Sequence, residues 1–306
     1  MKTLTAAALL LAALTSFGCA ARAAAPASPP TTATTATTTP PATRDGYVEV
    51  NGLRMYYQVH GVGRPIVMLH GALCTIEACL GSLISELAKT RQVLAFELQA
   101  HGRTADIDRP LTPTAMADDV AAAMAKLGVA KADVFGYSMG AGVALQMGIR
   151  HPQLVDKLVL QSVALTKAGF HPGLLDGIGK LDAAMFKGSP MEAGYLQVSS
   201  HGEAGFARLV HRVGEMNSSV EDVPAAKVKA ITAPVLLIAG DSDMMTPEHI
   251  AETFRLVGGG VMGDLAGLPR SQLAVLPGTT HMGLIARHRW VLDFTSAFLD
   301  APAAKR

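Results

Sequence analysis

From about residue 47 onwards, the apolar residues of the chain follow two alternating patterns. Short, unbroken apolar runs are typical of strands buried on both faces of a sheet, and helical spacing separates several of these runs. Strands that alternate with helices predict an α/β fold, with a mostly parallel sheet and helices on both faces. The predicted strands span residues 65–69, 92–96, 133–135, 157–160, 235–239 and 273–276, and the clearest helices span 115–127, 139–150 and 247–257.

The segment before the first of these strands predicts a hairpin. Residues 47–50 and 54–59 have strand-like composition and flank Asn51-Gly52, a dipeptide that marks tight turns between paired strands. We therefore expect antiparallel strands at one edge of the sheet.

Residues 164–230 interrupt the alternation, because they contain no buried-strand run. Helix-compatible pieces at 174–186, 191–198 and 205–216 alternate with Gly, Pro and Ser. We expect an insertion between two strands that forms a helical cap over the carboxyl edge of the sheet. Most of its larger apolar side chains should form the core of the cap rather than contact substrate: Leu174, Leu175, Ile178, Met185, Phe186, Met191, Tyr195, Phe206, Leu209 and Met216.

The first 45 residues differ in composition from the rest. An apolar run over residues 4–17 follows a basic start and is too short to span a bilayer, which is typical of a signal peptide, here residues 1–23. In a second interpretation, residues 15–19 form a lipoprotein signal that leaves Cys19 lipidated. Residues 24–45 are rich in Ala, Pro and Thr and should form a disordered linker. We therefore expect a periplasmic or extracellular protein, with or without a lipid anchor.

The remaining chain, residues 46–301, is long and apolar enough for one large domain with an insertion. Of the 306 residues, 49% are hydrophobic and 17% are charged. Lys and Arg number 26 against 25 Asp and Glu, so no basic surface favours nucleic acid. Three cysteines are too few for a disulfide-built scaffold, and no His or Cys group has the spacing of a zinc site. No membrane span is expected beyond the signal segment.

The sequence Gly136-Tyr-Ser138-Met-Gly140 lies directly between a predicted strand and a predicted helix. The pattern G-x-S-x-G in this context is typical of a sharp strand-to-helix turn that lifts the serine hydroxyl clear of the sheet. It also places the hydroxyl at the positive end of a helix. Ser138 is therefore a candidate nucleophile. In the alternative interpretation, its hydroxyl only caps the helix.

Together with this turn, further motifs resemble those of the α/β-hydrolase superfamily, in particular its esterase-like members with a helical cap. LHGA at 69–72 looks like the oxyanion loop of that family, and QAHGRT at 99–104 resembles its R-G-H-G-x-S segment. GDSD at 240–243 looks like its acid-bearing turn, and LPGTTH at 276–281 resembles its histidine turn. The resemblance covers nearly all of residues 46–300 and implies the α/β-hydrolase fold.

The resemblance implies a catalytic triad of Ser138, Asp243 and His281, in the order that the family shows. A serine hydroxyl needs an adjacent base, and that base needs a carboxylate to hold its tautomer. The resemblance also implies an oxyanion hole formed by the backbone N–H groups of Ala72 and Met139. No metal and no organic cofactor is expected.

Other polar residues near these motifs are expected to have structural roles. Asp241 competes with Asp243 for the acid position, and we interpret Asp241 as a turn former. His70 and His101 should shape the loops that carry them. The remaining histidines lie in polar surroundings and are expected at the surface: His60, His151, His171, His201, His211, His249 and His288.

The function predicted from these features is that of an exported serine hydrolase, a carboxylesterase that cleaves a hydrophobic small-molecule ester. The same triad also suits lactone or thioester hydrolysis, acyl transfer or cofactor-free perhydrolysis. A non-catalytic binding protein with the same fold is a more distant alternative. A serine at the turn argues against the family branches that attack with an aspartate, the haloalkane dehalogenases and epoxide hydrolases.

Two further patterns need interpretation. Cys74 and Cys79 could form a disulfide, or they could be buried free thiols; if both were helical, they would be too far apart to bridge. Residues 258–263 match G-x-G-x-x-G but follow a helix, and no acidic residue lies where a ribose would be bound. We interpret them as a connecting loop.

Overall fold

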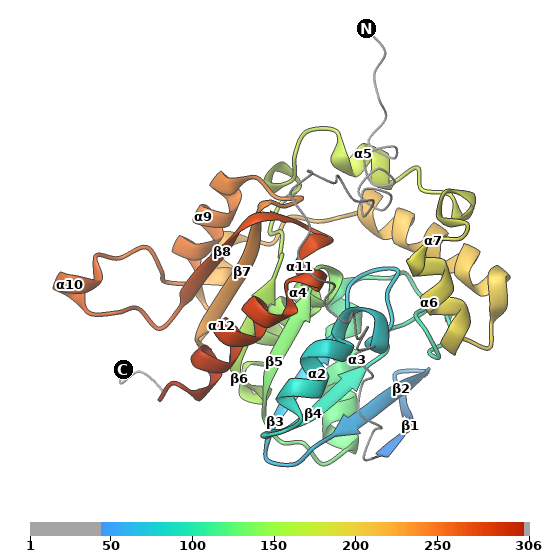
Figure 1. The fold of residues 1–306 in the computed structure, drawn as a ribbon, viewed down its shortest axis with the longest axis horizontal. Helices are drawn as coiled ribbons and strands as arrows, with labels where there is room; N and C mark the ends of the chain where they lie inside the picture. Colours follow the sequence, from blue (N-terminus) through green and yellow to red (C-terminus); the bar gives the residue numbers. More distant parts are fainter. Residues whose placement is uncertain (1–43, 303–306) are drawn as a thin grey trace, which may run out of the picture.

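The computed structural model describes residues 44–302 (Figure 1), so the predicted signal peptide, Cys19 and almost all of the predicted linker lie outside the described residues. Within this range the chain forms an eight-stranded sheet in the order β1-β2-β4-β3-β5-β6-β7-β8. Its strands are β1 (Arg44–Val50), β2 (Leu53–His60), β3 (Arg64–Leu69), β4 (Arg91–Phe96), β5 (Ala132–Tyr137), β6 (Val155–Gln161), β7 (Val235–Ser242) and β8 (Gln272–Thr280).

The sheet is mostly parallel, as the alternation of strands and helices predicts. β1 and β2 form the expected antiparallel hairpin, in which Val50 pairs with Leu53 across the turn. Asn51 and Gly52 both have positive φ, 50° and 80°, which suits the right-handed twist of a two-residue hairpin. β2 also pairs antiparallel with β4, and the other strand pairs are parallel. β8 pairs with β7 alone and closes one edge of the sheet.

The first strand begins before the predicted linker ends. Arg44 and Asp45 pair with Val59 and Gln58 of β2, and the Tyr56 hydroxyl donates to Asp45 at 2.7 Å. Both residues are exposed at the edge of the sheet. Because exposed edge residues need not be apolar, the composition of the sequence does not reveal this pairing. The predicted boundary between the linker and the folded domain is therefore too late in the sequence.

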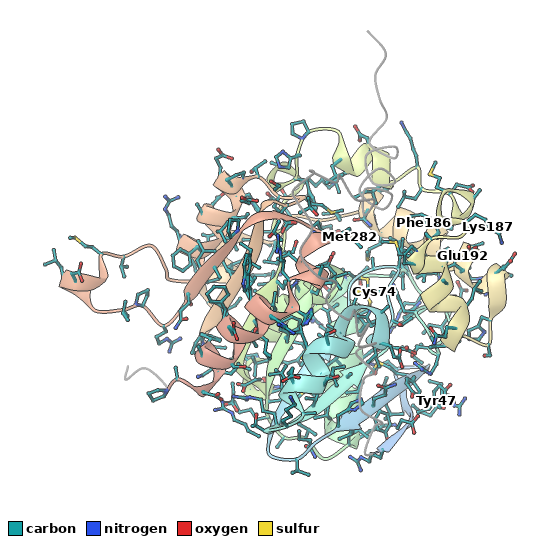
Figure 2. The ribbon with its side chains drawn as sticks, viewed as in Figure 1. Tyr47, Cys74, Phe186, Lys187, Glu192 and Met282 are labelled. Carbon is teal, nitrogen blue, oxygen red and sulfur yellow. A yellow bond between two sulfur atoms is a disulfide. The ribbon has the colours of Figure 1, made fainter. Side chains whose placement is uncertain are left out.

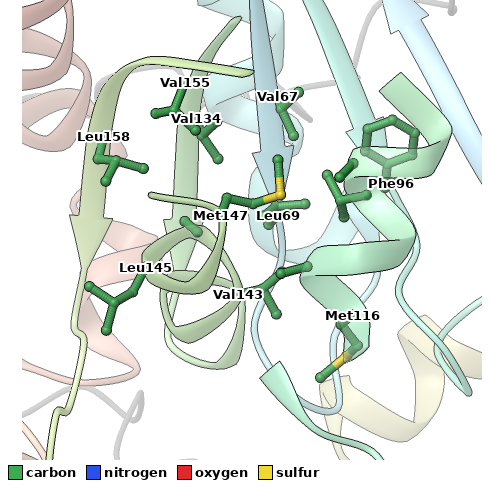
Figure 3. Packing of buried hydrophobic residues seen from close by; sticks show 14 of the residues in the cluster. Val67, Leu69, Phe96, Met116, Val134, Val143, Leu145, Met147, Val155 and Leu158 are labelled. Atoms are coloured by element: carbon green, nitrogen blue, oxygen red, sulfur yellow. The ribbon is translucent and has the colours of Figure 1, made fainter. Parts of the chain in front are cut away.

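Helices cover both faces of the sheet (Figure 1). α3 (Pro113–Lys126) and α4 (Met139–Arg150) pack against one face, where Val143, Leu145 and Met147 of α4 meet strand residues (Figure 3). α2 (Gly81–Leu87) and α12 (His288–Asp300) pack against the other. None of the helices within residues 44–302 is long and apolar enough to span a membrane.

The remaining short elements lie near the ends of strands. η1 (Ile76–Leu80) precedes α2, η2 (Pro152–Leu154) precedes β6, and α11 (Gly283–Ala286) follows β8. α9 (Pro247–Leu256) leads into the G-x-G-x-x-G segment and α10 (Gly263–Ala266), which project away from the sheet in Figure 1. This placement agrees with a connecting loop.

Residues 162–234 join β6 to β7 and include the insertion predicted at 164–230; no strand lies in this part of the described chain. We call it the helical insertion. Phe186, Tyr195 and Phe206 pack together there, with Leu73 and Leu111 of the neighbouring loops, and Figure 2 labels Phe186 in this region. Its elements are η3 (Lys167–Gly169), α5 (Leu174–Ile178), η4 (Ala183–Phe186), α6 (Pro190–Val198), α7 (Gly202–Ser218) and α8 (Ala225–Lys229).

Candidate active site

Ser138, Asp243 and His281 each lie one residue beyond the end of a parallel strand. Ser138 follows β5, Asp243 follows β7 and His281 follows β8. Since the carboxyl ends of parallel strands meet at one edge of a sheet, the topology brings together three side chains that are distant in sequence.

The turn that carries Ser138 has a backbone that requires glycine on both sides. Ser138 has φ 55° and ψ −117°, an uncommon conformation for a residue with a side chain. A Cβ at Gly136 would collide with the backbone of Gly140, and one at Gly140 would collide with the carbonyl oxygen of Leu69. Close packing of α4 on the sheet therefore explains the G-x-S-x-G pattern.

His281 lies between Ser138 and Asp243. Its Nε2 is 2.9 Å from Ser138 Oγ, and its Nδ1 is 2.7 Å from Asp243 Oδ1. A carboxylate only accepts hydrogen bonds, so Nδ1 carries the ring proton and Nε2 faces the serine hydroxyl with a lone pair. An imidazole in this state can accept the hydroxyl proton and thereby make Ser138 nucleophilic.

Asp243 is held as a carboxylate by its surroundings. Besides His281, the backbone N–H of Gly240 donates to Oδ2 at 3.1 Å and that of Met244 donates to Oδ1 at 2.7 Å. Burial alone would raise the pKa of the Asp243 carboxyl. The hydrogen bonds from His281, Ser162 and Gly240 and the nearby imidazole outweigh burial and hold this pKa below its usual value.

Ser162 is a fourth polar side chain at the site, and no sequence motif predicts it. Its hydroxyl donates to the Asp243 carboxylate, with Oγ 2.8 Å from Oδ1 and 2.9 Å from Oδ2. The same oxygen lies 2.7 Å from His281 Nδ1, so Ser162 touches both members of the pair. Its place directly after β6 was the available signal, but a serine there belongs to no motif.

Asp241 and Tyr137 hold the turn that carries His281. Asp241 accepts from the N–H groups of Gly278 at 2.8 Å and Thr279 at 3.0 Å, and these bonds lower the pKa of its carboxyl. This agrees with its interpretation as a turn former. The Tyr137 hydroxyl donates to the carbonyl oxygen of His281 at 3.1 Å, which adds a further constraint on the backbone of this turn.

The two expected oxyanion donors lie beside Ser138. Met139 is the first residue of α4, so its N–H has no partner within the helix. Ala72 lies on the loop after β3, and it lines the same cavity as Ser138, Met139 and His281. The arrangement can therefore direct two backbone N–H groups at an oxygen bound next to Ser138.

Two buried histidines shape the loop that carries Ala72. His70 Nε2 accepts from the N–H of Leu98 at 3.1 Å, and His101 Nε2 accepts from the N–H of Leu73 at 3.2 Å. Burial lowers the pKa of His70 to about 4 and the pKa of His101 to about 3. Both rings are thus neutral acceptors at ordinary pH, in agreement with their expected structural roles.

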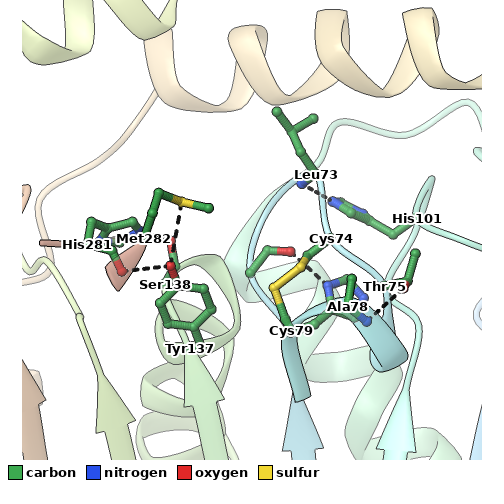
Figure 4. Close-up of a disulfide and its surroundings, with 12 residues drawn as sticks. Leu73, Cys74, Thr75, Ala78, Cys79, His101, Tyr137, Ser138, His281 and Met282 are labelled. Atoms are coloured by element: carbon green, nitrogen blue, oxygen red, sulfur yellow. Dashed lines mark hydrogen bonds between the residues drawn. A yellow bond between two sulfur atoms is a disulfide. The ribbon is translucent and has the colours of Figure 1, made fainter. Parts of the chain in front are cut away.

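Cys74 and Cys79 form a disulfide close to this loop (Figure 4). Cys74 lies in the turn before η1 and only Cys79 lies within it, so the two Cα atoms are 6.1 Å apart and within bridging range. Thr75 caps η1 between them by accepting from the N–H of Ala78. The bridge therefore joins the end of the loop that carries Ala72 to η1, the turn before α2.

Two histidines that were expected at the surface are buried. His60, on β2, is 2% exposed, and His249, on α9, is 5% exposed. His249 Nε2 accepts from the N–H of Leu165 at 2.9 Å. Polar neighbours in sequence indicate an exposed histidine only where they share a face with it. His60 and His249 are instead buried by segments that are distant in sequence.

A cavity of about 680 Å³ opens at Ser138 and His281, a size common for small-molecule sites. The helical insertion contributes to its wall through Ile178 and Met216. Most of the other apolar residues expected in this unit pack within its core, as predicted. The cavity places substrate-sized space directly against the candidate nucleophile.

The chain resembles known hydrolases in both sequence and fold. A family model described as alpha/beta hydrolase fold matches residues 64–190. Among curated proteins, "Putative carbamate hydrolase RutD" from Agrobacterium fabrum is 26% identical over 253 residues, which cover 74% of this chain and 91% of the relative.

Solved structures agree with this fold. The enol-lactonase from Burkholderia xenovorans LB400 superposes with a TM-score of 0.62 at 19% identity, covering 84% of this chain and 100% of the enol-lactonase. The meta-cleavage product hydrolase CumD from Pseudomonas fluorescens IP01 gives a TM-score of 0.60 at 19% identity, covering 85% and 98%.

Proposed function

Because the chain belongs to the alpha/beta hydrolase superfamily and is a hydrolase of that fold, we propose that it is a serine carboxylesterase acting on hydrophobic small-molecule esters. The observation that carries this proposal is the continuous hydrogen-bonded line from Ser138 through His281 to Asp243, which ends in a largely apolar cavity. No step of the proposed reaction needs a metal or an organic cofactor.

The proposed reaction proceeds in two halves. Ser138 Oγ attacks the ester carbonyl carbon while its proton passes to His281 Nε2, and the carbonyl oxygen becomes an oxyanion bound by the N–H groups of Ala72 and Met139. The C–O bond to the alcohol then breaks as Nε2 returns the proton to the leaving oxygen. Water repeats these steps on the acyl-enzyme, which releases the carboxylic acid and restores Ser138.

Asp243 and Ser162 act through His281 in this scheme. The carboxylate accepts from Nδ1 throughout, so it stabilises the imidazolium that forms when Nε2 takes the proton. The Ser162 hydroxyl orients that carboxylate. Lactone hydrolysis is a second candidate, because it uses the same steps on a cyclic ester and a structural relative is named an enol-lactonase.

Hydrolysis of p-nitrophenyl esters, from acetyl to dodecanoyl, tests the proposal. We expect turnover by the wild-type protein and its loss in Ser138→Ala, together with loss of fluorophosphonate labelling at Ser138. A folded protein that reacts with the probe but hydrolyses none of the esters would contradict the carboxylesterase proposal, and lactones would then be the next substrates to test. A folded protein that the probe does not label would contradict the serine mechanism itself.

We also propose that the enzyme is exported, on the basis of the composition of residues 1–23 alone. Cell fractionation with intact mass measurement tests this. A mature N-terminus near Ala24 supports a soluble exported form, and a diacylglyceryl group on Cys19 supports an anchored form. A protein that retains Met1 in the cytoplasm contradicts both.

A further inference from the structure

The cavity at Ser138 follows helix α4 along its whole length. Its lining residues on α4 recur every three or four positions and so share one side of the helix. They extend from the first residue of α4 to its last: Met139, Gly142, Leu145, Gln146, Ile149 and Arg150. We call the part of the cavity along these residues the α4 groove.

The length of the groove follows from the helix. α4 has 12 residues, and at about 1.5 Å per residue its two ends are about 16 Å apart. A fully extended chain advances about 3.5 Å for every three bonds. The groove therefore matches an extended alkyl chain of roughly a dozen carbons.

Part of the wall is apolar, as such a chain requires, through Leu145 and Ile149 of α4. Pro113, at the start of α3, packs beside Gly142 and lines the groove with it, and Val223, after α7, also lines it. Arg150, at the far end, is exposed and already binds Asp118 through two hydrogen bonds of 3.0 and 2.8 Å. Its charge is therefore paired. The exposed Lys227 and the carboxylates of Glu221 and Asp222 also line the cavity, so only part of the wall offers apolar contact to a ligand.

We propose that the α4 groove binds the acyl chain of the substrate, so that the preferred esters are those of unbranched, medium to long fatty acids. This inference rests on the esterase proposed above. The leaving alcohol must lie near His281, which donates its proton, and His281 is carried by β8. The groove leaves Ser138 along α4 instead, so it receives the acyl part rather than the alcohol.

Gly142→Leu tests the proposal by filling the groove one turn beyond Ser138. A Cβ at Gly142 would lie in ordinary contact with Pro113 Cγ, at 3.6 Å. Because Gly142 lines the cavity, we expect the rest of a leucine side chain to extend into it and to shorten the space for the acyl chain. Each methylene moved out of an apolar site costs about fourfold in binding. We expect the ratio of kcat/KM for the dodecanoyl ester to that for the acetyl ester to fall at least about 50-fold.

Two further variants distinguish obstruction of the groove from a general loss of stability or activity. Gln146→Phe fills the groove about 6 Å farther along, so it should reduce kcat/KM only for acyl chains several carbons longer than those affected by Gly142→Leu. Gly194→Leu, in α6, is the matched control. A Cβ there would also lie 3.6 Å from its nearest neighbour, Ala78 Cβ. Gly194 does not line the cavity, so we expect the ratio of kcat/KM for the dodecanoyl ester to that for the acetyl ester to stay at its wild-type value.

The outcomes distinguish this inference from the proposed function. If the wild type hydrolyses esters but the two groove variants keep its chain-length profile, the groove assignment is wrong and the esterase stands. If rates follow the alkyl length of the alcohol in a series of acetate esters, the acyl assignment is wrong.

If no ester is hydrolysed, the proposed function fails, and calorimetric binding of dodecanoate to Ser138→Ala tests the groove without catalysis. Binding that Gly142→Leu abolishes on this background supports the groove, and no binding to Ser138→Ala overturns it.

Discussion

The strand ends and the helical insertion meet at the same cavity but are held in different ways. At the strand ends, Ser162 and Tyr137 join the backbones and side chains around Asp243 and His281 through buried hydrogen bonds. The insertion packs mainly through its own apolar core and surface ion pairs such as Lys187–Glu203; Figure 2 labels Lys187 there. The sheet therefore positions the candidate catalytic side chains, and the insertion forms part of the cavity wall beside them.

Breaking the hydrogen-bonded line at the strand ends should have the largest effect. Asp243→Asn keeps the shape of the side chain but favours the wrong imidazole tautomer, and we expect kcat to fall about 10⁴-fold. Asp241→Asn is the control, because Asp241 contacts backbone N–H groups rather than the ring. Steady-state kinetics of both variants tests whether Asp243 is the acid of the triad. Comparable losses of kcat in the two variants would show that this assignment is wrong.

Removing the Ser162 hydroxyl should have the next largest effect. Hydrogen bonds to charged groups contribute about 1.5–3 kcal/mol, so Ser162→Ala should lower kcat by about 10- to 100-fold with little change in KM. Ser242 is exposed, on β7, and its hydroxyl donates to Asp241 Oδ1 at 3.2 Å, which makes Ser242→Ala the control. Equal kcat values for Ser162→Ala and the wild type would show that the Ser162 hydroxyl does not contribute to catalysis.

Loosening the insertion should act on selectivity and stability more than on chemistry. Arg212, on α7, donates to Asp106 at 2.9 Å and to the carbonyl oxygens of Ile107 at 2.8 Å and Arg109 at 3.0 Å, so it joins the insertion to the main domain. Arg212→Ala should destabilise the protein by about 2 kcal/mol and raise KM with kcat nearly unchanged.

Arg208→Ala is the matched control for this change, because Arg208 is exposed one turn earlier on α7. Thermal unfolding and ester kinetics of both variants give the comparison. A large fall in kcat for Arg212→Ala with unchanged KM would contradict the separation between the two regions.

The smallest expected effect concerns pH. The pKa of His101 is lowered to about 3 in the folded protein, so below pH 6.5 the unfolded chain binds a proton that the folded one does not. Stability should therefore fall as the pH drops from about 6.5 to 5, by up to about 1.4 kcal/mol per pH unit from this residue. Urea unfolding of His101→Gln should show a shallower dependence, and an unchanged slope would contradict the prediction.

The fold was largely predictable because most strands are buried on both faces and therefore carry unbroken apolar runs. The hairpin, the parallel strands and the strand-free insertion all follow from such local signals. β1 began earlier than expected and His60 and His249 proved buried, since these features depend on pairing and packing with distant segments. A pattern of neighbouring residues in the sequence does not reveal contacts with distant segments.

The candidate site was predictable in part for the same reason. Ser138, Asp243 and His281 each stand in a motif directly after a strand. The structure places His281 within hydrogen-bonding distance of both Ser138 and Asp243. Ser162 has the same position after β6 without a motif, so only the distances to Asp243 and His281 reveal it. The pairing of Cys74 with Cys79 required knowledge of where η1 begins.

The position of β8 has a consequence for how activity is acquired during synthesis and folding. His281 lies 143 residues after Ser138 and is mounted on a strand that pairs with β7 alone. Contacts so far apart in sequence form late, because a long loop must close before they contribute. A nascent or refolding chain can therefore complete most of its sheet while still inactive. If the proposed esterase activity is correct, its recovery during refolding should follow the pairing of β8 with β7 rather than the burial of the core.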